Sequence, residues 1–227
     1  MIYVMSDIHG CYDKYVKMLD KIKFSLEDTL YILGDVVDRG ENGMEVLLDI
    51  AKRENVILLR GNHDEQARML LSNVYMLEEE NCPKELVEMF GLWLSDGGET
   101  TLSEFLKLSE KDKITALETL NNSLISKEIK VNKNYFILAH TVPEVDIICD
   151  YEEWGIQEYL WGEPDYEEIY FDDKYVVTGH TPTGCIDVKS IGKIWQGNNH
   201  IAIDCGAVFG NPLGCMCLDS FKEFYVE

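Results

Sequence analysis

The sequence of 227 residues lacks any apolar run near the ~20 residues that a membrane-spanning helix requires. Its first residues also lack a basic stretch followed by an apolar one, so no secretory signal is visible. We therefore expect a cytoplasmic protein that has no membrane partner.

Paired cysteines are also missing. The chain has seven cysteines but no Cys-x-x-Cys pair. The odd number argues against a disulfide framework, and the missing pair argues against a structural zinc site held by thiolates. We expect buried, reduced thiols, and Cys215 and Cys217 lie two apart in an apolar segment, hence on one face of a strand.

Basic residues are scarce. The 20 lysines and arginines face 42 aspartates and glutamates, which gives a formal net charge of −22. A field of this sign repels nucleic acid and anionic membranes. A nucleic-acid partner is therefore not expected.

What the chain does contain is enough apolar material for a core. Hydrophobic residues make up 46% of it, which suits a single domain over residues 1–227. In the first third, short apolar runs alternate with segments of helical spacing, which predicts an α/β fold. The expected strands there are 2–5, 30–33 and 56–59, with helices over 11–22 and 43–52.

The remaining sequence divides into two parts. Residues 64 to about 130 have mostly helical patterns, and we expect a helical insertion on the same domain. The rest is rich in short β-type runs. The expected strands are 135–139, 175–178, 185–188, 201–203, 214–218 and 221–226.

Residue types that bind metals come immediately after five of the strand-like runs. They occur in segments 7–9, 34–40, 60–64, 139–140 and 179–181. Ligands bind beyond the carboxyl ends of strands in open α/β sheets, so these segments can converge on one site. Four of the five histidines lie in them, and His200 alone is left over. A lone histidine after a strand is usually structural, but this set favours a metal centre.

The ordered motifs resemble the calcineurin-like metallophosphoesterases. They are Asp7-x-His9-Gly10, Gly34-Asp35-x-x-Asp38-Arg39-Gly40, Gly61-Asn62-His63-Asp64, His140 and Gly179-His180. The intact Asp38-Arg39-Gly40 resembles the phosphoprotein phosphatases, above all the small phage and bacterial serine/threonine phosphatases. The resemblance covers nearly the whole chain and implies a β-sandwich flanked by helices.

The resemblance implies two divalent metal ions. Manganese is expected, with iron or zinc as alternatives, and carboxylate, imidazole and amide oxygen donors suit such ions. The ligands would be Asp7, His9, Asp35, Asn62, His140 and His180. Asp7 and His9 would bind one ion, Asp35 would bridge the two, and the remaining three would bind the second.

The resemblance also implies catalytic roles. His63 would be the general acid, held by Asp38, while Arg39, Arg60 and Asn62 would bind the substrate phosphate. A hydroxide activated by the two ions would attack the phosphorus. The implied substrate is a phosphorylated protein or a small phosphoester.

Two departures from the family pattern leave alternatives open. Asp64 stands where the protein phosphatases have Glu, and this variant resembles the symmetrical diadenosine tetraphosphate hydrolases. Those hydrolases tend to lack the aspartate found here as Asp38. No arginine follows Trp161, where phage-type phosphatases carry one, so the third phosphate contact is not identified. We expect a serine/threonine-type protein phosphatase or phosphomonoesterase, with the symmetrical hydrolase as the alternative and a non-catalytic phosphopeptide binder ranked last.

Overall fold

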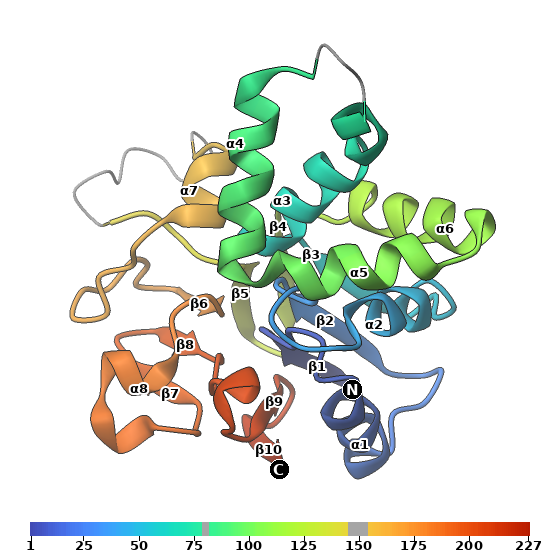
Figure 1. The fold of residues 1–227 in the computed structure, drawn as a ribbon. Coiled ribbons are helices and arrows are strands. Elements are labelled where there is room, and N and C mark those ends of the chain that lie inside the picture. The colour runs from blue at the N-terminus through green and yellow to red at the C-terminus, as the bar shows by residue number, and fades with distance from the viewer. Residues whose placement is uncertain (79–81, 145–153) are drawn as a thin grey trace.

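The structure, a computed structural model, describes residues 1–78, 82–144 and 154–227. Within these residues the strands form two five-stranded sheets, and helices flank them (Figure 1). Each sheet contains both parallel and antiparallel pairs. The predicted α/β architecture of two sheets flanked by helices is confirmed.

The first sheet has the strand order β10-β9-β1-β2-β3. Its strands are β1 (Ile2–Met5), β2 (Thr29–Leu33), β3 (Val56–Leu59), β9 (Leu213–Cys217) and β10 (Lys222–Val226). Strands β1, β2 and β3 are parallel because helices α1 (Tyr12–Ile22) and α2 (Gly43–Ile50) connect them. Their carboxyl ends therefore meet at one edge of the sheet.

The second sheet has the order β4-β5-β6-β8-β7. Its strands are β4 (Ser126–Val131), β5 (Asn134–Ala139), β6 (Lys174–Thr178), β7 (Trp195–Gly197) and β8 (His200–Ala202). Strands β5, β6 and β8 are parallel. The sequence patterns did not predict the short edge strands β4 and β7.

Alternation along the strands builds the core on both faces of the first sheet. Val4 of β1 packs between the two sheets with Phe136 and Leu138 of β5. Its neighbours Tyr3 and Met5 point the other way and pack under the helices. The two sheets are therefore the layers of a sandwich, with a second core under the helical side.

The segment predicted to be a helical insertion covers that second core (Figure 1, teal to green). It contains α3 (Asn62–Leu71), η1 (Val74–Glu78), α4 (Lys84–Trp93), the π-helical turn η2 (Leu94–Gly98), α5 (Glu99–Lys107) and α6 (Glu110–Asn121). The helices end before residue 130, because residues 126–131 pair with β5 as a hairpin whose turn places Asn132 at φ 55°. None of the described helices is both long enough and apolar enough to cross a membrane.

The prediction of a strand at 185–188 is wrong. The structure has α8 (Thr183–Ile186) and η5 (Val188–Ser190) there, after α7 (Ile156–Trp161) and before η6 (Ala207–Phe209). Pro182 precedes α8, and its carbonyl accepts the backbone N–H of Cys185, so the chain turns instead of pairing with a sheet. Cys185 is also exposed, whereas Cys215 and Cys217 are buried as expected.

Candidate active site

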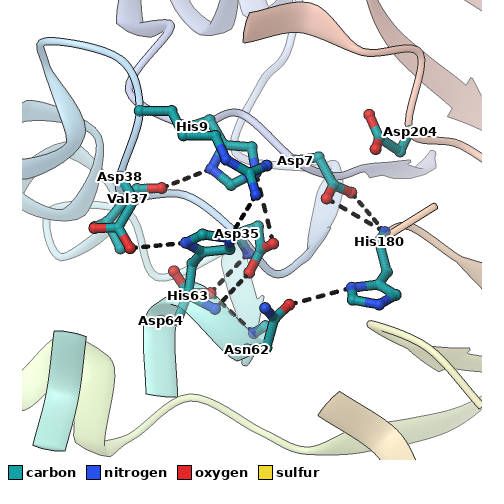
Figure 2. Close-up of polar contacts among 12 residues, drawn as sticks. Asp7, His9, Asp35, Val37, Asp38, Asn62, His63, Asp64, His180 and Asp204 are labelled. Atoms are coloured by element: carbon teal, nitrogen blue, oxygen red, sulfur yellow. Dashed lines mark hydrogen bonds and ion pairs between the residues drawn. The ribbon is translucent and has the colours of Figure 1, made fainter. Parts of the chain in front are cut away.

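The candidate residues lie together at the carboxyl ends of five strands drawn from both sheets. Figure 2 shows most of their side chains turned toward one another. Asp7 and His9 follow β1, Asp35 follows β2, Asn62 and His63 begin α3 after β3, His140 follows β5, and His180 follows β6. The shared strand edge thus brings together residues that are up to 173 positions apart, as in the bond from the His180 backbone N–H to Asp7.

Asp35 lies at the centre of this arrangement. Its Oδ2 is 3.6 Å from Nε2 of His9 and 3.5 Å from Nε2 of His140. Two groups of residues that could hold a metal ion share it: one adds His9 and His63, and the other adds His140 and His180. One carboxylate between two ligand groups is the geometry that a bridging ligand requires.

The chemistry of the second group fits a cation. His140 Nδ1 lies 2.8 Å from the carbonyl oxygen of Leu33, to which it can only donate, so its Nε2 carries a lone pair. That Nε2 lies 2.9 Å from Oδ1 of Asn62 and 3.1 Å from Nδ1 of His180. Three groups that can each offer a lone pair therefore face one point.

Protonation of these rings is disfavoured. Burial lowers the pKa of His140 well below its usual range, and burial lowers the pKa of His180 to about 4. A neutral imidazole is the form that binds metals, so both rings are ready to act as ligands near neutral pH.

His9 is held in the same way on the other side of Asp35. Its Nδ1 donates to the carbonyl oxygen of Val37 at 2.8 Å, which leaves the lone pair on Nε2. Nη1 of Arg39 donates to that lone pair at 2.9 Å. The lone pair can serve Arg39 or a metal ion, so metal binding at His9 requires Arg39 to give up this bond.

Two buried carboxylates lie at the site, and for Asp35 the effect of burial outweighs that of the nearby Arg39 guanidinium, which lowers its pKa. Burial raises the pKa of both Asp7 and Asp35 well above the usual range, and the carboxylates of Asp204 and Asp64, respectively, raise these pKa values further. A divalent ion between such groups favours their charged forms and reverses the shift. Charge and donor type therefore both fit a metal centre.

The backbone at the site is unusual. Eleven described residues other than glycine have positive φ angles, and six of them are candidate site residues: Asp7, His9, Asp35, Asp38, Arg39 and His180. This conformation costs ~1–2 kcal/mol per residue and concentrates at functional sites. Close approach adds a second constraint, because a Cβ at Gly61 would overlap Asp35 and one at Gly179 would overlap Asp7.

His63 is held from both sides. Its Nδ1 lies 2.8 Å from Oδ2 of Asp38, and its Nε2 lies 2.9 Å from Nη2 of Arg39. Asp38 is fully buried, and its Oδ2 also accepts the indole N–H of Trp93 at 2.8 Å. The carboxylate therefore fixes the ring so that Nε2 faces the site (Figure 2).

Trp93 and Asp96 are site residues that the sequence analysis missed. Oδ1 of Asp96 lies 3.5 Å from Nη2 of Arg39, and its Oδ2 lies 3.7 Å from Nε2 of His63. Both residues come from the helical segment rather than from a strand end. The only local signal is the Gly97-Gly98 pair, which marks a turn but does not show what the turn approaches.

Arg60, which the resemblance assigned to the substrate phosphate, is bound by protein groups in the structure. Its Nε donates to Oγ of Ser123 at 2.8 Å, and its Nη1 donates to Glu65 at 2.9 Å. Its Nη2 donates to the carbonyl oxygens of Leu120, Asn121 and Ser123. Because all three nitrogens bind protein groups, in α3 at Glu65 and around the end of α6, this geometry does not support a phosphate-binding role for Arg60.

Asp64 also has a structural task. Its carboxylate accepts the backbone N–H groups of Asp35, Val36 and Gly61 at 2.8, 3.0 and 3.0 Å. It therefore ties the loop after β2 to the start of α3. The contacts of Asp64 are thus with the backbone, and its link to the symmetrical hydrolases rests on the resemblance of the motif alone.

Comparison with known proteins bears on the chemistry of this site. A family model described as calcineurin-like phosphoesterase matches residues 1–184. The chain is 27% identical to the bis(5'-nucleosyl)-tetraphosphatase PrpE [asymmetrical] of Bacillus velezensis, over 92% of this chain and 86% of that one. It is 36% identical to a symmetrical bis(5'-nucleosyl)-tetraphosphatase of Wigglesworthia glossinidia brevipalpis, but over 37% of this chain and only about a third (32%) of that one.

Solved structures share the fold. A crystal structure named provisionally as a diadenosine tetraphosphatase superposes with a TM-score of 0.67, at 18% identity, over 99% of this chain and 92% of that chain. A protein serine/threonine phosphatase from Saccharomyces cerevisiae superposes with a TM-score of 0.57, at 14% identity, over 100% of this chain and 79% of that chain. At these identities the likeness concerns the fold alone.

Proposed function

Because this chain belongs to the calcineurin-like phosphoesterase family, we propose that it hydrolyses the polyphosphate bridge of dinucleoside tetraphosphates. Membership of the family makes it a metal-dependent hydrolase. The observation that carries the reaction type is the position of Asp35 between His9 and His140.

We assign the metal ligands as a proposal. Asp7, His9 and Asp35 would hold one ion, and Asp35, Asn62, His140 and His180 would hold the other. When bound, two divalent ions would polarise the phosphoryl oxygens and supply hydroxide near neutral pH. The metal itself is not assigned, and manganese stays the prediction from the sequence.

The protein's own groups then act on the substrate. Arg39, once it leaves the lone pair of His9, is placed to bind the phosphoryl oxygens with its planar guanidinium. Once Nη2 of Arg39 has also left Nε2 of His63, that nitrogen can carry a proton and would donate it to the leaving oxygen, and Asp38 would stabilise the imidazolium form. Asn62 is proposed both as a metal ligand and as a contact to the substrate phosphate.

The relatives support the substrate. The bis(5'-nucleosyl)-tetraphosphatase that matches nearly the full chain is the asymmetrical type. Asymmetrical hydrolysis adds one water to give a nucleoside monophosphate and a nucleoside triphosphate, whereas symmetrical hydrolysis gives two diphosphates. We propose a tetraphosphate hydrolase ahead of the protein phosphatase that the sequence analysis placed first, and we propose the asymmetrical pattern in place of the symmetrical one that it gave as the alternative.

A product analysis tests this proposal. Diadenosine tetraphosphate, a phosphoserine peptide and 4-nitrophenyl phosphate are compared with manganese present, and nucleotides are separated by ion-exchange chromatography. We expect the tetraphosphate to be the best substrate and to give AMP and ATP in equal amounts. Chelation should abolish activity and manganese should restore it. Two ADP molecules per substrate would refute the asymmetrical pattern, and poor cleavage of the tetraphosphate would refute the proposal.

Protein phosphatase activity is the second candidate, and one observation favours it. His63 and Asp38 form a buried, well-supported acid pair. A serine alkoxide is a far more basic leaving group than a nucleotide phosphate, so it needs such an acid more. Efficient turnover of the phosphoserine peptide with poor cleavage of the tetraphosphate would favour this candidate.

A further inference from the structure

One aromatic side chain near the site is exposed for no reason that the fold supplies. Phe209 is 63% exposed, while the other aromatic among the exposed large hydrophobic residues of the described chain, Trp161, is 37% exposed. Leaving a phenyl ring in water forgoes the hydrophobic stabilisation that burial gives. An exposed ring beside a catalytic site is therefore a candidate for contact with a ligand.

The ring lies beside the proposed machinery. Its centroid is 5.6 Å from Cζ of Arg39, a cation–π distance. The same guanidinium lies 2.9 Å from Nε2 of His63. Phe209 is thus one guanidinium away from the proposed acid, the group that would protonate the leaving oxygen.

The loop that carries the ring is fixed. Gly206 and Gly210 flank η6 with φ angles of 79° and 88°, which residues with a Cβ adopt only at a cost. Nζ of Lys14 donates to the carbonyl oxygens of Ala207 and Asn211 at 3.3 and 2.6 Å. Lys14 therefore anchors the loop to α1, so the backbone that carries the ring has a fixed position.

We propose that Phe209 is a stacking platform for the nucleobase on the leaving side of the substrate. This inference rests on the proposed function, because it assigns a contact to the adenine of the dinucleotide. A purine offers a flat π face, and base–aromatic stacking is a strong, sequence-tolerant interaction. Arg39 can extend the same surface, since a guanidinium also stacks on aromatic rings.

The test separates the base from the phosphate. AMP and ribose 5-phosphate differ only in the base, so each is titrated as an inhibitor of 4-nitrophenyl phosphate hydrolysis by the manganese-loaded enzyme. In Phe209→Ala we expect inhibition by AMP to weaken about tenfold and inhibition by ribose 5-phosphate to stay the same. The KM for diadenosine tetraphosphate should rise by a similar factor. Phe209→Trp should restore inhibition by AMP.

A matched control excludes a general surface effect. Val188→Ala removes an apolar side chain that is 75% exposed in the same half of the chain, and it should leave both inhibition constants unchanged. Equal inhibition constants for AMP in wild type and Phe209→Ala would overturn the platform. Impaired turnover of a phosphopeptide without loss of AMP inhibition would also overturn it, because the ring would then serve a peptide.

The two proposals fail in different ways. If wild type cleaves the tetraphosphate but Phe209→Ala leaves inhibition by AMP unchanged, the platform is refuted and the function stands. If wild type does not cleave the tetraphosphate, the proposed function fails. The inhibition constants of AMP and ribose 5-phosphate still test the stacking role of Phe209 in that case. If AMP inhibits wild type more strongly than ribose 5-phosphate does, and Phe209→Ala abolishes this difference, the stacking role is supported. If the two compounds inhibit wild type equally, it is refuted.

Discussion

The indole N–H of Trp93 donates a hydrogen bond of 2.8 Å to Oδ2 of Asp38. The same oxygen receives Nδ1–H of His63 at 2.8 Å. Trp93 ends α4, and Thr101 of α5 accepts the backbone N–H of Asp38 at 2.8 Å. The helical segment therefore supports the proposed acid pair as well as covering the core.

Trp93→Phe tests whether the hydrogen bond from Trp93 to Asp38 contributes to catalysis. The variant keeps a ring in the core but removes the N–H, and a buried hydrogen bond to a charged group contributes about 1.5–3 kcal/mol. We expect kcat to fall about tenfold for substrates with poor leaving groups and much less for 4-nitrophenyl phosphate. Steady-state kinetics with a series of aryl and alkyl phosphates measures this. An equal loss for all leaving groups would mean that Trp93 acts only through the stability of the fold.

The strand ends could be predicted because each reactive residue is adjacent in sequence to an apolar run. The patterns placed Asp35 after one strand and His140 after another, and parallel strands bring such ends together wherever the chain runs between them. Tertiary contacts between distant residues have no such signal in the neighbouring sequence. Nothing near Trp93 shows that its indole meets Asp38, 55 residues away.

Arg60 is a second residue whose tertiary contacts could not be predicted from the local sequence. The family resemblance implied a phosphate contact for Arg60, but a sequence motif does not fix where a long side chain points. Glu65 and the carbonyl groups at the end of α6 determine its direction, and that helix end comes about 60 residues later in the chain. Its role could not be derived from the motif alone.

Two arginine variants separate these roles. Arg60→Met breaks a buried pair with Glu65, which keeps its second partner Arg68, so the free energy of unfolding should fall by about 1–3 kcal/mol while the folded fraction keeps its kcat and KM. Arg39→Met should leave the free energy of unfolding nearly unchanged but raise KM about 10–100-fold, because a charge-assisted bond to phosphate is lost. Urea denaturation and steady-state kinetics measure both. A raised KM with unchanged stability in Arg60→Met would reinstate its phosphate role.

His200 makes stability depend on pH. The ring is buried against Tyr166, Tyr170 and Trp195, and burial lowers its pKa from 6.5 to about 3. Between these values the unfolded chain binds the proton and the folded protein does not, so stability falls as pH falls below 6.5. From pH 6.5 to 4.5 the loss should be about 2–3 kcal/mol.

His200→Gln isolates this contribution. The variant keeps a polar partner for Thr178 but cannot titrate, and the other four histidines remain in both proteins. Urea denaturation of the metal-free proteins from pH 7 to 4.5 should therefore give a shallower decline for the variant. Parallel declines would mean that protonation of His200 does not contribute to acid unfolding.

The acid role of His63 predicts a dependence on the leaving group. His63→Asn should lower kcat without changing the metal content, since His63 is not among the assigned ligands. General acid catalysis is worth ~10²–10⁴-fold, and the loss should fall in that range for poor leaving groups. It should shrink for 4-nitrophenyl phosphate, whose leaving group needs little protonation. Asp38→Asn should give a smaller defect of the same kind, because it removes the partner that orients and charges the imidazole.

Combined and contrasting variants test whether the pair acts as a unit. The double variant of His63 and Asp38 should be barely worse than His63→Asn, because residues that act together are not additive. Asp35→Asn should instead lose bound metal, measured by atomic emission, and lose activity toward every leaving group. His63→Asn equally damaging toward good and poor leaving groups, with the metal content unchanged, would contradict the acid role. It would show that His63 mainly positions the phosphate through its contact with Arg39.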